Sequence, residues 1–156
     1  MRATPALTCF LRCIILRRAL RVWQRRCVFS RKAGAVAWPK TQRVGVRCTP
    51  RGFEQRGVYV CNGAWSRTRG LLGRPEDSSA LLFPCGSVHT IGMRRAIDVI
   101  YLSRAARVVR IVSALRPLRA SVGPRGSFAV LEVPASSGRM LQVGDELEWM
   151  SEEEQA

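Results

Sequence analysis

From about residue 54 onward, the apolar residues of this chain come in short runs that are separated by Gly, Pro, Ser and Arg. Such runs between turn-forming residues are typical of β-strands, whereas a helix needs a longer segment with a period of about 3.6 residues. Strands are therefore expected at 58–61, 80–83, 88–93, 98–103, 107–115, 128–134 and 143–149. One short helix is expected at 66–73, because Ser66 can cap its start and Gly73 can end it.

This pattern predicts a mainly β fold, namely a small barrel-like or sandwich domain of about seven short strands with one short helix. Strand 98–103 is apolar on both faces and is expected to be central. In 128–134, alternate side chains share a face, so Leu131 and Glu132 are expected on opposite faces. Long helices do not alternate with the strands, which argues against a Rossmann-like fold.

The formal net charge of +15 is distributed unevenly along the chain. Residues 1–53 carry thirteen Arg and Lys and no Asp or Glu, whereas residues 54–156 carry the other thirteen basic residues and all eleven acidic ones. Blocks of like charge are usually disordered. We therefore divide the chain into a basic N-terminal extension of low order at 1–53, a β domain at 54–150 and an acidic tail at 151–156. Because charge is nearly balanced over residues 54–156, the β domain is not expected to bind a specific nucleic acid.

The extension has two interpretations, which the sequence leaves open. In the first, the start codon is assigned too early and residues 1–45 do not exist in the natural protein; Val36, Val44 and Val46 are then candidate starts. In the second, the extension contacts an anionic membrane or nucleic acid through its arginines. Arginine recurs too often for a membrane-spanning segment or a secretory signal. A cytoplasmic location is expected for the chain as it stands, and an exported one if the true start differs.

The stretch PCGSVHTIGMRRAIDVIYL, residues 84–102, holds the single histidine of the chain, His89. Cys85 and Met93 lie four residues to either side, and thiolate, imidazole and thioether are together suited to copper. A His₂Cys copper site needs a second histidine, which the chain lacks. A metal site at Cys85, His89 and Met93 is therefore a minor alternative, and no cofactor is expected.

Nucleophilic catalysis is a second alternative for the same stretch. Either Cys85 or Ser87 can be written as a nucleophile beside His89 and Asp98, but no nucleophile elbow or oxyanion-hole motif accompanies them. In the simpler interpretation, Cys85 is a small buried apolar residue and His89 is a hydrogen-bonded strand residue. We assign no catalytic residue, and the sequence argues against an enzyme more than for one.

Asp98 begins an otherwise apolar strand, so its carboxyl group needs hydrogen-bond donors. These donors can come from an arginine (Arg69, Arg94 or Arg95) or from backbone N–H groups. A role in pinning the preceding loop to the strand is favoured over contact with a ligand, because buried carboxyl groups are usually satisfied internally. Glu132 is expected to be buried in the same way and to meet an arginine.

The motifs RTRGLLGR, ALLF, VHTIGMRRAIDVIYL, VVRI, LRPLR, VLEVPA and VGDEL follow one another in this order. The series resembles the prokaryotic family called domain of unknown function 192, over about residues 56–149. The resemblance implies a small, mainly β, barrel-like or sandwich domain and no established activity. Recurring positions of the family match Arg69, Gly70, Leu71, Met93, Asp98, Glu132, Pro134, Gly144 and Asp145. The chain departs from the family at Ala96, where Pro is common, and at Ser136, where Gly is common.

These observations favour a noncatalytic β module that binds a small ligand or a protein partner. The candidate ligand contacts are Arg69, His89, Thr90, Met93 and Asp98. Two alternatives stay open: a metal protein or hydrolase centred on Cys85, His89 and Asp98, and a peripheral membrane or nucleic-acid protein that uses residues 1–53. The sequence does not say whether Cys61 and Cys85 form a disulfide.

Overall fold

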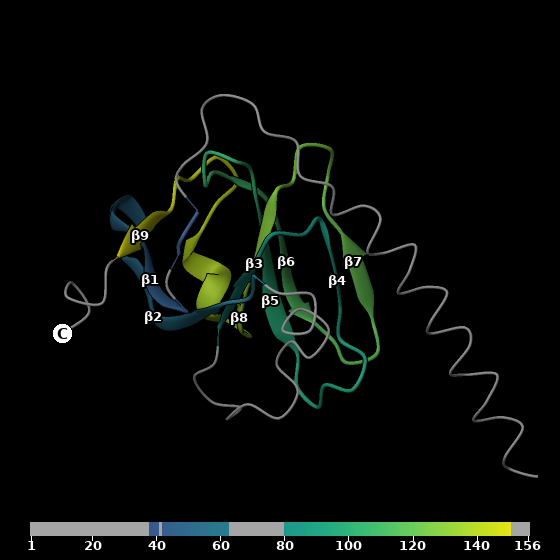
Figure 1. Cartoon of the computed structure of the whole chain (residues 1–156). Helices are drawn as coiled ribbons and strands as arrows, with labels where there is room; N and C mark the ends of the chain where they lie inside the picture. Colours follow the sequence, from purple (N-terminus) through teal and green to yellow (C-terminus); the bar gives the residue numbers. More distant parts are fainter. Residues whose placement is uncertain (1–37, 41, 63–79, 151–156) are drawn as a thin grey trace, which may run out of the picture. The chain divides into compact units, whose positions relative to one another are not determined.

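The structure is a computed structural model that describes residues 38–40, 42–62 and 80–150, all within one compact unit, Lys32–Ala156. The described residues form nine strands and two 3-10 turns (Figure 1). The strands are β1 (Arg43–Cys48), β2 (Phe53–Val60), β3 (Leu81–Phe83), β4 (Ser87–His89), β5 (Ile97–Leu102), β6 (Val108–Leu115), β7 (Ala120–Val122), β8 (Ala129–Pro134) and β9 (Glu148–Met150). The 3-10 turns are η1 (Thr49–Arg51) and η2 (Ser137–Met140).

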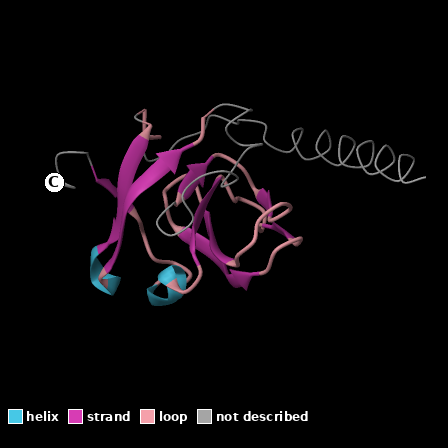
Figure 2. Cartoon of the chain, turned by 90° about the horizontal axis from the view of Figure 1, so that it is seen from below, coloured by secondary structure: helices cyan, strands magenta, loops and turns pink. Residues whose placement is uncertain are grey.

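Seven of these strands form one sheet in the order β6-β5-β8-β3-β2-β1-β9, and β4 pairs with β7 in a separate small sheet. Strands β2 and β3 run parallel, whereas the other described pairs are antiparallel. The prediction of a mainly β fold is confirmed (Figure 2). The large sheet does not close into a barrel, so the architecture is barrel-like or sandwich-like with open sheet edges.

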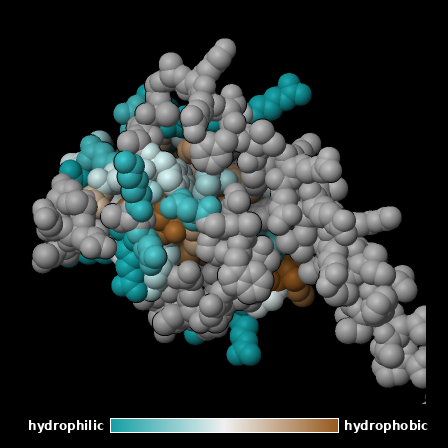
Figure 3. All heavy atoms as spheres, viewed as in Figure 1, coloured by the Kyte–Doolittle hydropathy of each residue, from teal (hydrophilic) through white to brown (hydrophobic). Residues whose placement is uncertain are grey.

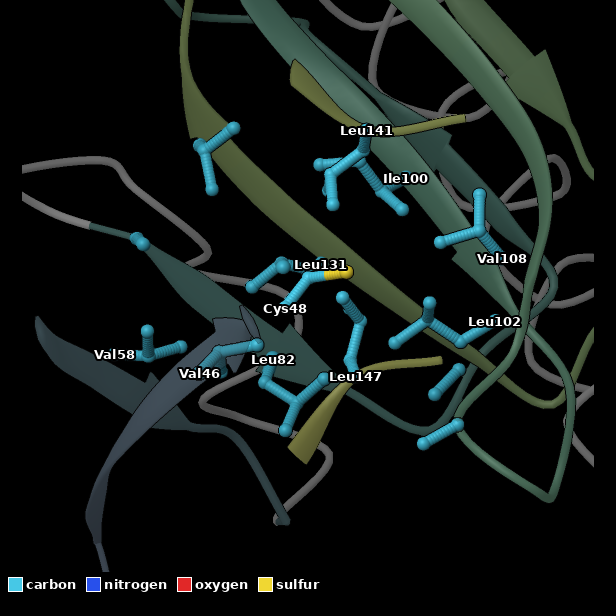
Figure 4. Close-up of a cluster of buried hydrophobic side chains, with 14 of the residues drawn as sticks. Val46, Cys48, Val58, Leu82, Ile100, Leu102, Val108, Leu131, Leu141 and Leu147 are labelled. Carbon is cyan, nitrogen blue, oxygen red and sulfur yellow. The ribbon is translucent and has the colours of Figure 1, made fainter. Parts of the chain in front are cut away.

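One face of the large sheet packs on the main hydrophobic core. Figure 4 shows Leu131 of β8 in this core together with Leu82 of β3 and Ile100 of β5. Ala129 and Val133 belong to the same core, so the predicted alternation along β8 holds. The alternation follows from the pleat of a strand, which sends every second side chain to the same face.

The opposite face of the large sheet carries a second buried layer. Its members include Leu81, Val99, Tyr101, Val130 and Glu132. The small sheet adjoins this layer, because Gly123, just after β7, lies directly against the ring of Tyr101. The N–H of Gly123 also donates to the carbonyl of Gly86, just before β4, at 2.8 Å. The small sheet and the β5–β8 part of the large sheet therefore enclose Tyr101 between them.

Replacing Gly123 with alanine is expected to destabilise the domain by about 2 kcal/mol, because a Cβ atom there would overlap the Tyr101 ring and the Ser127 hydroxyl. Urea unfolding followed by circular dichroism measures this loss. Gly86→Ala is the control for the steric part, because Gly86 has no positive φ and a Cβ there would meet Ser127 only at an ordinary contact distance of 3.8 Å. Equal losses in both variants would mean that backbone effects, and not the contact with Tyr101, set the cost.

The predicted boundary between extension and β domain, at residues 53 and 54, is wrong. β1 (Arg43–Cys48) lies inside the large sheet, paired with both β2 and β9. Val44, Val46 and Cys48 are buried in the main core, whereas Arg43 is exposed and Arg47 is half-buried. A chain that started at Val44 or Val46 would lack part of this strand. Residues 1–37 and 41 of the extension lie outside the described residues.

Three further details of the structure differ from the expectations, and a fourth expectation is not tested. β7 (Ala120–Val122) was not predicted, because it is short and two of its three residues are exposed. β4 ends at His89 instead of 93, since Gly92 adopts a left-handed turn conformation with φ 84°. β9 is confined to Glu148–Met150, because Gly144, with φ 100°, still belongs to a turn. The predicted helix at 66–73 lies outside the described residues.

Candidate functional site

Glu132 is the most unusual polar group of the second buried layer. The side chain lies on β8 between Leu81 of β3 and Val99 of β5, which are its direct neighbours across the strands. None of the described residues donates a hydrogen bond to its carboxyl group. Burial among these apolar side chains raises the pKa of Glu132 to about 8. The group is therefore a neutral carboxylic acid at neutral pH, with one O–H donor and one carbonyl acceptor.

Tyr101 lies on the same face, two residues along β5 from Val99. Its hydroxyl group is buried and has no hydrogen-bond partner among the described residues. Burial raises the pKa of Tyr101, while the Ser121 hydroxyl and the Arg110 guanidinium nearby partly lower it. Ser121 is thus a neighbour of the hydroxyl group, but its geometry does not make a hydrogen bond. The Glu132 carboxyl lies close enough to raise the pKa of Tyr101 further.

We call these two side chains the Glu132–Tyr101 pair. Both are buried: Glu132 is 5% exposed and Tyr101 is 0% exposed. The 5% exposure means that Glu132 is not sealed off from solvent. A carboxyl group and a phenol hydroxyl thus lie on one side of the sheet, and neither has a hydrogen-bond partner among the described residues.

Cys85 and Ser87 lie at the border of this site. The Cys85 sulfur is 3.9 Å from the Ser87 hydroxyl, and both residues are buried. Cys85 also lies near Tyr101, whose pKa it raises. Cys48, Cys61 and Cys85 are all free thiols, so Cys61 and Cys85 are not joined by a disulfide.

His89 lies on the other side of the small sheet. Paired residues of antiparallel strands share a face, so His89 shares a face with Ala120, which is exposed. Val88 and Ser121 form the inward-facing pair, consistent with the position of Ser121 beside Tyr101. Burial lowers the pKa of His89, so its half-buried imidazole is neutral at neutral pH.

Asp98 faces the main core on the opposite side of β5 from Tyr101. One carboxyl oxygen accepts a hydrogen bond from the N–H of Ala114 at 2.8 Å, and the other accepts from the N–H of Gly138 at 3.0 Å. The donors are backbone groups of β6 and η2, and no arginine is among them. Asp98 thus ties β5 to its neighbours, whereas His89 lies beyond the second buried layer. The structure does not bring Cys85, His89 and Asp98 together into a triad.

Thr90 is fully buried and holds two loops together. Its hydroxyl donates to the carbonyl of Arg116 at 2.6 Å and accepts from the N–H of Arg119 at 3.0 Å. Met93, in the same turn, is half-buried, and its N–H donates to the carbonyl of Thr90 at 3.2 Å. The Thr90 hydroxyl is therefore already used within the protein, which leaves it little capacity for a ligand.

Arg69, another of the predicted ligand contacts, lies outside the described residues. The remaining predicted contacts, His89, Thr90, Met93 and Asp98, lie at three separate places, so the structure does not gather them into one site. In the described part of the chain, no group of three or more His, Cys, Asp and Glu residues is arranged to hold a metal ion. No helix in the same part is long and apolar enough to cross a membrane.

An arginine was expected beside Glu132, but no described arginine pairs with it. Tyr101 was not among the predicted site residues. Tyr101 could have been predicted from the strand IDVIYL, because its hydroxyl group is the only polar side-chain group of that strand after Asp98. A buried polar atom in such a strand needs a partner, and this requirement applies to Tyr101 as much as to Glu132.

A family model matches residues 47–149, which is more than half of the chain; it is DUF192, with the description "Uncharacterized ACR". The match confirms the resemblance seen in the motifs. No curated protein matches the chain significantly.

Two solved structures are similar to this fold. One is a protein of unknown function from Novosphingobium aromaticivorans DSM 12444, with 20% identity and a TM-score of 0.59 over 78% of this chain and 100% of the other. The second is a "putative transcription regulator" from Sinorhizobium meliloti 1021, with the same identity and TM-score over 74% of this chain and 98% of the other. At this identity the similarity shows the fold alone.

Proposed function

The chain belongs to the DUF192 family, whose description names no activity, and we propose that it is a small noncatalytic module that binds a polar ligand at the Glu132–Tyr101 pair. The observation that carries the proposal is a buried carboxyl group without a hydrogen-bond partner among the described residues. Buried polar groups are nearly always paired, because an unpaired one costs about 1–3 kcal/mol. A ligand that supplied the missing partner would recover this cost.

The protonation of Glu132 defines the chemistry of the proposed ligand. A neutral carboxylic acid and a phenol hydroxyl each offer one donor and one acceptor. This set complements a neutral ligand whose own donor and acceptor lie side by side, as in a primary amide. Leu81 and Val99, on either side of Glu132, would add apolar contact. An anionic ligand would find no cation in the pair to balance its charge.

A binding role is favoured over catalysis because the chemistry-bearing groups are separated. A nucleophile needs a base within hydrogen-bond reach. Cys85 borders the site, whereas His89 pairs with the exposed Ala120 at the end of β4. The carboxyl group of Asp98 is occupied by two backbone N–H groups on the other side of β5.

Titration with acetamide and benzamide tests this function on the ¹⁵N-labelled full chain by NMR. We expect saturable shifts of the amide signals of Val99, Tyr101 and Glu132. Glu132→Leu and Tyr101→Phe should each weaken binding about tenfold, since each removes a hydrogen bond worth about 1–1.5 kcal/mol. Glu146→Gln, which changes an exposed carboxyl group, is the matched control and should bind like the wild type.

Two results would contradict the proposal. One is the lack of saturable shifts at this face in the wild-type chain with either amide. The other is unchanged binding in both Glu132→Leu and Tyr101→Phe, with thermal unfolding showing that the two variants are folded. Shifts that centre on the His89 side of the small sheet would likewise exclude the Glu132–Tyr101 pair as the binding site.

A further inference from the structure

Two loops at one end of the small sheet are locked together by Thr90. They are residues 90–95, after β4, and residues 116–119, before β7, and we call them the loop pair. The N–H of Thr90 donates to the carbonyl of Arg119 at 2.8 Å, and the N–H of Leu118 donates to the carbonyl of Thr90 at 3.0 Å. With the two bonds of the Thr90 hydroxyl, the loops form one hydrogen-bonded platform.

The platform presents two large apolar side chains to solvent. Leu118 is 70% exposed and Ile91 is 41% exposed. Leu118 also has a φ of 57°, a left-handed conformation that a residue with a bulky side chain rarely adopts. Strain of this kind is retained where surrounding structure enforces it and is a feature of functional sites. Figure 3 shows hydrophobic atoms reaching the surface low on the right, the side on which β4 and β7 lie in Figure 1.

Three arginines belong to the same two loops as these side chains. Arg94, Arg116 and Arg119 are exposed, and within the described ranges none of the three has an ion-pair partner. Residues 84–131 carry eight arginines and a single acid, Asp98, which is buried and bonded to backbone groups. The near balance of charge over residues 54–156 therefore hides a strongly basic region, because ten of the eleven acidic residues lie outside residues 84–131.

Exposed aliphatic side chains and exposed arginines in the same pair of loops match one partner chemistry better than others. An anionic bilayer offers phosphate groups to the arginines and an apolar interior to the aliphatic side chains. Single-stranded nucleic acids are bound through aromatic side chains, and neither described loop contains one. A stable protein partner usually needs about 800 Å² of surface on each side, far more than two side chains supply. We propose that the loop pair docks the protein on an anionic membrane surface.

In this arrangement Leu118 and Ile91 enter the headgroup region while Arg94, Arg116 and Arg119 contact lipid phosphates. Flotation of the full chain with vesicles of phosphatidylcholine, alone or mixed with phosphatidylglycerol, tests it. The wild type should float with the mixed vesicles only. A cation near an anionic surface contributes about 1 kcal/mol, or about fivefold in binding, so the triple variant Arg94→Gln/Arg116→Gln/Arg119→Gln should bind about a hundredfold more weakly.

A matched control removes the same charge at other loops. Arg104→Gln/Arg125→Gln/Arg139→Gln changes three arginines outside the loop pair. Because residues 1–53 remain in every variant, any contribution of that basic segment is constant. The control should lose less than fivefold, since long-range attraction alone depends on net charge and is screened by salt.

The contribution of the two exposed apolar side chains, Ile91 and Leu118, is tested separately. Ile91→Ser/Leu118→Ser should weaken binding about tenfold, and the loss should persist at high salt, because burial of apolar surface is not screened. Met140→Ser/Val143→Ser changes two other exposed apolar residues and should have no effect.

Four outcomes overturn the proposal. They are no flotation of the wild type with mixed vesicles, equal losses in the two arginine triple variants, full binding by Ile91→Ser/Leu118→Ser, and a loss of binding to a DNA duplex in the loop-pair variant without a loss of vesicle binding. The substituted side chains are exposed except Arg104, which is half-buried over the Phe128 ring, and unchanged thermal unfolding confirms that each variant is folded.

Discussion

Replacing Glu132 with glutamine is expected to remove most of the pH dependence of folding stability between about pH 4.5 and pH 8. The pKa of Glu132 is raised from 4.5 to about 8 by burial in the folded state. Below pH 4.5 the carboxyl group is protonated whether the chain is folded or unfolded. As the pH rises above 4.5, the unfolded chain loses this proton while the folded chain keeps it, so the wild type becomes less stable until about pH 8.

The size of this effect follows from the shift. Each pH unit between the two pKa values costs about 1.4 kcal/mol, so the wild type should lose roughly 4 kcal/mol by pH 8. Glutamine has nearly the same shape and stays neutral, so Glu132→Gln should match the wild type at pH 4.5 and exceed it by roughly 4 kcal/mol at pH 8. Such a difference is a large part of the 5–15 kcal/mol that typically stabilises a domain.

Urea unfolding at a series of pH values measures this prediction. Glu146→Gln is the control, since Glu146 is an exposed carboxyl group that pairs with Arg107. Its stability profile should run parallel to that of the wild type. If the profile of Glu132→Gln also ran parallel to the wild type, Glu132 would have to be ionised in the folded protein, and a neutral hydrogen-bonding site would be excluded.

Replacing Asp98 with alanine is expected to destabilise the domain by about 3–5 kcal/mol. Asp98 lies opposite an irregular part of the β5–β6 ladder, where the pairing shifts between Ile97 and Val99. At this bulge Ala114 adopts a left-handed conformation with φ 50°, and its N–H bonds to Asp98. Gly138 donates to the second oxygen in a buried position. Alanine would leave two N–H groups unpaired at about 1–3 kcal/mol each.

Asp98→Asn separates the hydrogen bonds from the general loss of packing. Its amide oxygen can accept one of the two bonds, so it should lose about half as much stability as Asp98→Ala. Hydrogen exchange provides a local readout: in Asp98→Ala the amides of Ala114 and Gly138 should exchange faster, relative to global unfolding, than in the wild type. Unchanged protection of both amides would show that the carboxyl group does not hold the bulge.

The sequence was sufficient to predict the apolar strands of the large sheet but not β1 and β7. β5 and β8 are buried apolar runs with regular alternation, and both were placed to within about one residue. β1 was missed because Arg43 and Arg47 made it resemble the basic segment before it. β7 was missed because it has only three residues, two of them exposed, which carry no hydrophobic period. Such strands owe their structure to their pairing partners, which local patterns do not reveal.

The candidate site was less predictable for a related reason. The apolar surroundings of Glu132 come from Leu81 and Val99, which become its neighbours only when three distant strands pair. For His89 and Asp98, closeness in the sequence suggested a shared site that the structure does not form. His89 belongs to the small sheet, whereas Asp98 lies on the main-core face of β5 in the large sheet. A buried carboxyl group could be predicted from the alternation of β8, but the lack of a described partner could not.

The thiols of Cys48 and Cys85 report separately on the opening of the two buried layers of this fold. Cys48 lies in the main core and Cys85 beside Tyr101 in the second layer, and both thiols are buried. A thiol reagent can modify either sulfur only when its own layer opens, and burial, which raises the pKa of Cys48, slows that thiol further. The rates at which these two sulfurs are labelled therefore time the opening of each layer from within the native chain, without any engineered probe.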